Sequence, residues 1–146
     1  MDNLPARRAL QHHVPGWVDD DSEWFVTVCC QPRGRNQLAV PMVHAKIETA
    51  FAHYAKLGKM QVRTWVAMPD HLHFVARFNK HAGMARTVCG LKHYLAAQAD
   101  VRWQRGFFDH RLRSATEMKA KCAYVRMNPV RAGLARTAEE WPYRGG

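Results

Sequence analysis

The fold is decided by the stretch VAMPDHLHFVARF, residues 66–78. Pro69-Asp70 interrupts two runs of apolar and β-branched residues. Proline and aspartate are typical of turns, so the stretch predicts the end of one strand, 60–68, a break, and a second strand, 71–78. The second strand carries His71 and His73 one residue apart, although it otherwise has the composition of a buried strand.

Strand 71–78 has two unlike faces, because successive side chains of a strand point to opposite sides of the sheet. The apolar face holds Leu72, Phe74, Ala76 and Phe78, and the other holds His71, His73, Val75 and Arg77. We expect helices to cover the first face and the two imidazoles to project side by side from the second, open face. There they are spaced to share one metal ion, and Arg77 is a candidate to hold a phosphate. The alternative is a pair of solvated histidines. Two ligands are too few for a structural zinc site, which needs about four, but they suit a catalytic ion with open positions.

The other segments alternate between strand and helix patterns. Apolar residues recur at spacings of three and four from Met42 until Gly58, and again over residues 84–99. Aromatic and β-branched residues predict strands at 24–30 and 106–113, and a last helix is predicted at 116–128. The order β-α-β-β-α-β, followed by a helix, predicts an α+β fold: a ferredoxin-like antiparallel sheet with helices on one face, plus a C-terminal helix that carries a tyrosine.

The last predicted helix has a polar and an apolar stripe. The polar stripe starts at Lys121 and continues three and seven residues later with Tyr124 and Asn128, so the three side chains share one side of a helix. The apolar stripe, Met118, Cys122 and Val125, can anchor the helix and leave the polar stripe facing a cleft. Pro129 predicts that the helix ends near Asn128. The alternative is that Tyr124 packs at the edge of the core and Asn128 caps the helix end.

Size and composition predict one domain. The chain has 146 residues, which we divide into an irregular N-terminal lead-in, 1–23, and a single domain, 24–146. Its four cysteines include no CxxC pair, which argues against a disulfide framework or a zinc ribbon. No apolar run approaches the roughly 20 residues of a membrane span, and the N-terminus lacks the apolar core of a signal peptide. We therefore expect a cytoplasmic protein without a membrane partner.

The charge favours a polyanionic partner. Lys and Arg number 22 against 12 Asp and Glu, a net charge of +10, and nucleic acid is the first candidate. A solvated basic surface is the alternative. Trp65 and Phe108 are candidates to stack unpaired bases. The candidate DNA-binding cations are Arg77, Lys121, Arg111, Arg113, Arg126 and Arg131.

Two motifs together, MPDHLHF and YVRMNPVRAGL, closely resemble those of the REP-associated tyrosine transposases, within the HUH family of single-stranded-DNA transposases and nucleases. The resemblance covers roughly residues 24–143. It implies a ferredoxin-like fold, Tyr124 as nucleophile, and a divalent ion, Mg²⁺ or Mn²⁺, held by His71, His73 and Asn128. The usual motif has Asn where this chain has Asp70, and we expect this difference to alter the turn or the local charge rather than ligation.

The resemblance also implies a substrate and a reaction. The substrate would be single-stranded DNA carrying a hairpin, such as a repetitive extragenic palindrome of a bacterial nucleoid. The reaction would be endonuclease cleavage and rejoining through a 5′-phosphotyrosine, the chemistry of DNA transposition and recombination, by a monomer or a homodimer. The alternatives are a non-catalytic nucleic-acid-binding module on the same fold, a degenerate transposase, and a metal-dependent hydrolase with a water nucleophile.

Overall fold

The hairpin of β2 (Met60–Met68) and β3 (His71–Phe78) lies inside a five-stranded antiparallel sheet. The computed structural model describes residues 22–146. The strand order is β4-β1-β3-β2-β5, with β1 at Glu23–Cys29, β4 at Phe108–Leu112 and β5 at Arg144–Gly145. The first four strands have the order of a ferredoxin-like sheet, which confirms the predicted α+β fold class.

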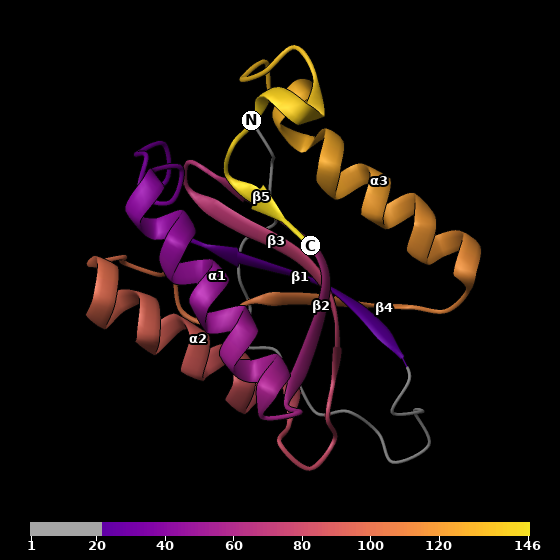
Figure 1. The fold of residues 1–146 in the computed structure, drawn as a ribbon. Helices are drawn as coiled ribbons and strands as arrows, with labels where there is room; N and C mark the ends of the chain where they lie inside the picture. The colour runs from indigo at the N-terminus through magenta and orange to yellow at the C-terminus, as the bar shows by residue number, and fades with distance from the viewer. Residues whose placement is uncertain (1–21) are drawn as a thin grey trace.

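Three helices pack on this sheet, and they occupy both faces. The helices α1 (Pro41–Lys56) and α2 (Met84–Ala99) lie together on one face, while α3 (Ala115–Arg131) lies apart from them (Figure 1). A short 3₁₀ helix, Ala138–Glu140, follows α3. The apolar residues predicted to face the first two helices are all in the larger core cluster: Leu72, Phe74, Ala76 and Phe78. The alternation of β3 is therefore confirmed.

The second face of the sheet is not open, which corrects the expectation from the sequence. Val66, Met68 and Val75 form a second core cluster there, together with Val125 of α3. These apolar side chains would otherwise face water, so burying them against α3 is favourable. The stripe predicted to anchor the last helix, Met118, Cys122 and Val125, makes this contact. Helix α3 thus covers part of the face that carries the two histidines.

Helix α3 also runs further than predicted, to Arg131 instead of Asn128. Proline lacks an N–H, so Pro129 forfeits one helical hydrogen bond, but the next turn is held by bonds from Ala132 N–H to Asn128 O, 3.0 Å, and from Leu134 N–H to Pro129 O, 2.9 Å. Asn128 lies inside the helix, and the alternative in which it caps the helix end is wrong. At the other end, the Ser114 Oγ accepts a hydrogen bond from the Glu117 N–H and caps the helix.

The remaining boundaries differ little from the predictions. Strand β1 begins at Glu23, so the expected lead-in over residues 1–23 lies almost wholly outside the described residues. Strand β4 is shorter than predicted, since Gly106 has a φ of 74° and belongs to a turn. Strand β5 was not predicted, because two residues carry no periodic signal. Among the described residues, no helix combines the length and apolar character needed to cross a bilayer.

The contact between α3 and the sheet gives a testable prediction. Val125 is 0% exposed, so Val125→Ala should lower the free energy of unfolding by about 2 kcal/mol, from two lost buried carbons and the cavity they leave. Met127 lies on the same helix and is 42% exposed, so Met127→Ala should change it by less than about 0.5 kcal/mol. Urea unfolding of the variants measures both. Equal losses would mean that α3 does not pack through Val125.

Candidate active site

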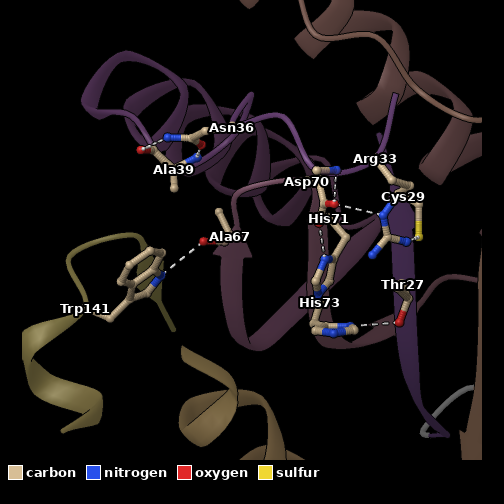
Figure 2. Close-up of polar contacts among 11 residues, drawn as sticks. Thr27, Cys29, Arg33, Asn36, Ala39, Ala67, Asp70, His71, His73 and Trp141 are labelled. Carbon is tan, nitrogen blue, oxygen red and sulfur yellow. Dashed lines mark hydrogen bonds and ion pairs between the residues drawn. The ribbon is translucent and has the colours of Figure 1, made fainter. Parts of the chain in front are cut away.

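His71 and His73 lie side by side on β3, with ring centroids 4.6 Å apart. They are 5% and 2% exposed, so the alternative of two solvated histidines is wrong. Each ring is fixed through Nδ1 (Figure 2): His71 Nδ1 lies 2.8 Å from Asp70 Oδ1, and His73 Nδ1 lies 2.8 Å from Thr27 Oγ1 of β1. With Nδ1 engaged in this way, Nε2 is the nitrogen through which each ring can bind a metal ion.

Asp70, in the turn between β2 and β3, is held by the loop that follows β1. Its Oδ2 accepts hydrogen bonds from Arg33 Nε, 2.9 Å, and from the Gly34 N–H, 2.8 Å. Burial opposes the charge on this carboxyl, but the hydrogen bonds from Gly34, His71 and Arg33 outweigh it and lower the pKa of Asp70 from 3.8 to about 2. Asp70 is therefore ionised at neutral pH and places a negative charge beside the histidines.

Asn128 approaches the histidines from α3. It is 4% exposed, and it lines a hollow of about 420 Å³ together with His71, Asp70, Arg33 and Arg131. Its buried Nδ2 atom has no hydrogen-bond partner within the part of the chain that the structure describes. Buried polar atoms generally have a hydrogen-bond partner. The oxygen and nitrogen of an amide are told apart only by such partners, so a rotation of the Asn128 amide by about 180° would put its oxygen, which can bind a metal ion, at this position. An amide so placed fits the role of a ligand on the wall of a hollow.

Tyr124 lies one turn before Asn128 on α3, beside the second histidine. Its ring centroid is 6.1 Å from that of His73 and 6.0 Å from that of Phe25. Two cations flank the same ring: the Arg131 guanidinium lies 3.9 Å from the centroid and Lys121 Nζ lies 4.9 Å from it. Helix α3 thus brings the phenol beside His73, the amide to the hollow that His71 lines, and two of the predicted cations to the phenol ring.

The other predicted DNA-binding residues lie elsewhere. Arg77 is four residues along β3 from His73, roughly 13 Å at the rise of a strand, and with Arg113 it lines a separate hollow of about 410 Å³. Arg111 pairs in register with Trp24, which packs into the core on the face of α1 and α2. Arg126 is exposed, 3.7 Å from Glu139. The structure gathers Lys121 and Arg131 at the tyrosine and leaves these four apart.

Several residues of this site were not predicted, among them Phe25, Thr27 and Arg33. The Phe25 ring stacks on His73 with centroids 5.2 Å apart and an interplanar angle of 27°. Alternation within β1 already places Phe25 and Thr27 on one face, but only the pairing of β1 with β3 shows that it is the histidine face. The suggestion that Trp65 stacks bases is wrong, because Trp65 pairs with Phe74 and is buried under α1.

The donor set fits a divalent ion with open coordination positions. Residues 22–146 contain no group of three His, Cys, Asp or Glu side chains placed to hold a metal ion. A site here would therefore combine the two imidazoles with a ligand of another type, and Asn128 is the buried amide on the hollow that His71 also lines. Imidazole nitrogen and amide oxygen are ligands for manganese and related divalent ions.

Comparison with known proteins places the chain in a family. The family model of IS200-like transposases matches residues 24–128. The chain belongs to this family of transposases. The match includes His71, His73, Tyr124 and Asn128. Members of the family are tyrosine transposases, enzymes that transfer DNA strands.

Individual relatives agree with this assignment. The transposase is 24% identical over 131 residues to the REP-associated tyrosine transposase of Escherichia coli K12, covering 82% of this chain and 73% of that protein. Its fold is similar to the structure of a REP-associated tyrosine transposase bound to a REP hairpin, with a TM-score of 0.74 and 19% identity over 97% of this chain and 81% of that one. The second comparison supports the ferredoxin-like fold.

The ionised Asp70 gives a prediction about pH. Its pKa is lower in the folded protein than in the unfolded chain, so its contribution to stability is present above about pH 4 and is lost as the pH falls towards 2. Asp70→Asn should therefore lower the free energy of unfolding at neutral pH by about 1–3 kcal/mol. The difference from the wild type should shrink below about pH 4. Urea titrations over a pH series measure this. A difference independent of pH would show that the charge of Asp70 does not stabilise the fold.

Proposed function

We propose that this transposase cleaves and rejoins single-stranded DNA that carries a hairpin, with Tyr124 as the nucleophile and a divalent ion held by His71, His73 and Asn128. The observation that carries the proposal is the position of α3. It places the ring centroid of Tyr124 6.1 Å from that of His73, and it places Asn128 on the hollow that His71 also lines.

The chemistry is a transesterification at phosphorus. The Tyr124 oxygen attacks the scissile phosphodiester and forms a 5′-phosphotyrosine, while the bond to the 3′-oxygen breaks and a 3′-hydroxyl leaves. The reverse attack by a 3′-hydroxyl rejoins the strand and restores the phenol. Lys121 and Arg131 supply positive charge beside the phenol, at 4.9 and 3.9 Å from its centroid, where it can stabilise a phenolate or hold the phosphate.

The ion would be Mn²⁺ or Mg²⁺. When bound, such an ion supplies Lewis-acid polarisation of the phosphate. The chain's own residues orient the ligands: Asp70 and Thr27 fix the two imidazoles, and the turns of α3 fix Asn128 relative to Tyr124. Two imidazole ligands favour manganese by softness, while cellular abundance favours magnesium.

The DNA partner is proposed from charge and from a relative. The related transposase whose fold is similar was solved with a REP hairpin, and this chain has a net charge of +10. A basic protein binds the DNA backbone with an affinity that falls steeply as salt rises. The cations beside Tyr124 would hold the strand at the scissile phosphate, and those in the hollow of Arg77 and Arg113 could hold a more distant part of the backbone.

The nucleophile is tested with Tyr124→Phe. The wild type, incubated with Mn²⁺ and a labelled hairpin oligonucleotide with single-stranded flanks, should give a protein band that carries label on a denaturing gel. Tyr124→Phe should lose this band and keep hairpin affinity within about threefold, since it removes one hydroxyl. Tyr94→Phe is the matched control, because Tyr94 lies on α2 across the sheet.

The alternatives predict other results. Cleavage by Tyr124→Phe at the wild-type yield would mean that water is the nucleophile and that the protein is a hydrolase. Binding of the hairpin by the wild type, without an adduct on any palindrome of the host, would favour a non-catalytic binding module.

The requirement for a divalent ion is tested by chelation and by substitution of the proposed ligands. EDTA should abolish the adduct, and Mn²⁺ should restore it. His73→Ala and Asn128→Ala should each lower the cleavage rate at least roughly 100-fold, because the polarisation of the phosphate contributes several kcal/mol. His93→Ala, on the exposed side of α2, should cleave at the wild-type rate. Full activity of His73→Ala in EDTA would contradict the proposed site.

A further inference from the structure

The two histidines are held by partners of different chemistry. A carboxylate only accepts hydrogen bonds, so the contact of 2.8 Å between Asp70 Oδ1 and His71 Nδ1 requires a proton on Nδ1. The lone pair of a neutral His71 is then on Nε2, where a metal ion binds. Thr27 has a hydroxyl, which can donate or accept, so its contact with His73 fits either tautomer. Asp70 thus selects one form of His71, and Thr27 selects neither form of His73.

The carboxylate of Asp70 is itself fixed, through its other oxygen. Oδ2 accepts from Arg33 Nε and from the Gly34 N–H, at 2.9 and 2.8 Å, while Oδ1 faces His71. Figure 2 shows the contacts that run from Asp70 to Arg33 and to His71. The Asp70 and Arg33 side chains are 11% and 25% exposed, so water screens this ion pair less than one on the surface.

Backbone bonds tie the same loop to the same turn. The Cys30 N–H donates to Asp70 O, 2.8 Å, and the N–H groups of Gln37 and Leu38 donate to Pro69 O, 2.7 and 3.1 Å. Both ends of the segment 30–38 are therefore bonded to the turn that precedes His71. Arg33, near its middle, reaches Asp70 and also lines the hollow shared by His71 and Asn128.

We infer that Asp70 is a positioning residue: held by Arg33 and Gly34, it fixes the tautomer and orientation of His71 so that Nε2 faces the ion. The inference rests on the metal site of the proposed function, and it assigns to the loop after β1 a role in metal binding although that loop supplies no ligand. Partners of this kind typically change metal affinity roughly 10- to 100-fold when they are removed.

The tautomer can be measured without metal. Long-range ¹H–¹⁵N spectra of the metal-free protein at mildly alkaline pH distinguish a protonated from an unprotonated ring nitrogen. In the wild type, His71 Nδ1 should be protonated. In Asp70→Ala the proton should move largely to Nε2, and in Asp70→Asn, whose amide can donate as well as accept, the two forms should both be populated. Retention of the Nδ1–H form in Asp70→Ala would overturn the inference.

The effect on metal is measured as the Mn²⁺ dissociation constant, by titration calorimetry or electron paramagnetic resonance. Asp70→Ala and Asp70→Asn should weaken binding roughly 10- to 100-fold, and Arg33→Gln by less, because the carboxylate remains. Glu117→Gln is the matched control: Glu117 also pairs with a histidine, His110, at 2.9 Å, but on the exposed side of α3. It should bind Mn²⁺ as the wild type does.

The two measurements separate the failure of this inference from that of the proposed function. Wild-type Mn²⁺ affinity in both Asp70 variants would overturn the inference and leave the metal site standing. A wild type that binds no Mn²⁺ would overturn the metal site, while the nitrogen spectra would still decide whether Asp70 fixes His71. If Asp70→Ala does not fold, Asp70→Asn, which keeps the side-chain size, carries both measurements.

Discussion

The site depends on the burial of α3 against the second face of the sheet. Val125 meets Val66, Met68 and Val75 in a core cluster separate from the one under α1 and α2. This apolar contact carries the helix across the histidine strand and fixes the height and rotation at which Tyr124 and Asn128 arrive. A helix that docked one turn further along would move its residues by about 5.4 Å and separate the phenol from the imidazoles.

Covering that face removes polar groups from water, and the chain compensates with specific partners. Burying a polar group without a hydrogen bond costs free energy. His71 is bonded to Asp70, His73 to Thr27, and Asp70 to Arg33 and Gly34, so each imidazole sits in a fixed orientation. Rings held in this way need little rearrangement to bind an ion, which is the general advantage of a preorganised site.

The basic residues divide into groups with different surroundings. Lys121 and Arg131 lie against the Tyr124 ring, while Arg77 and Arg113 lie at the other end of the sheet face and Arg111 is on the opposite face. Net charge therefore says little about where a DNA strand would run. The proposed function assigns the scissile phosphate to the two cations that lie against the Tyr124 ring, because the other arginines lie apart from that ring.

The sequence by itself determined the element order, the two faces of β3 and the anchoring stripe of α3, because alternation and helical periodicity are local properties. The HxH pair and the tyrosine helix were also visible, as motifs. Only the tertiary structure decided that the histidine face is covered, that Phe25 and Thr27 lie on it, that Trp65 is buried and that Arg33 reaches Asp70. Those facts follow from strand pairing and helix docking between segments far apart in the chain. Even the end of α3 depended on this packing, because Pro129 is buried and the following turn holds the helix beyond it.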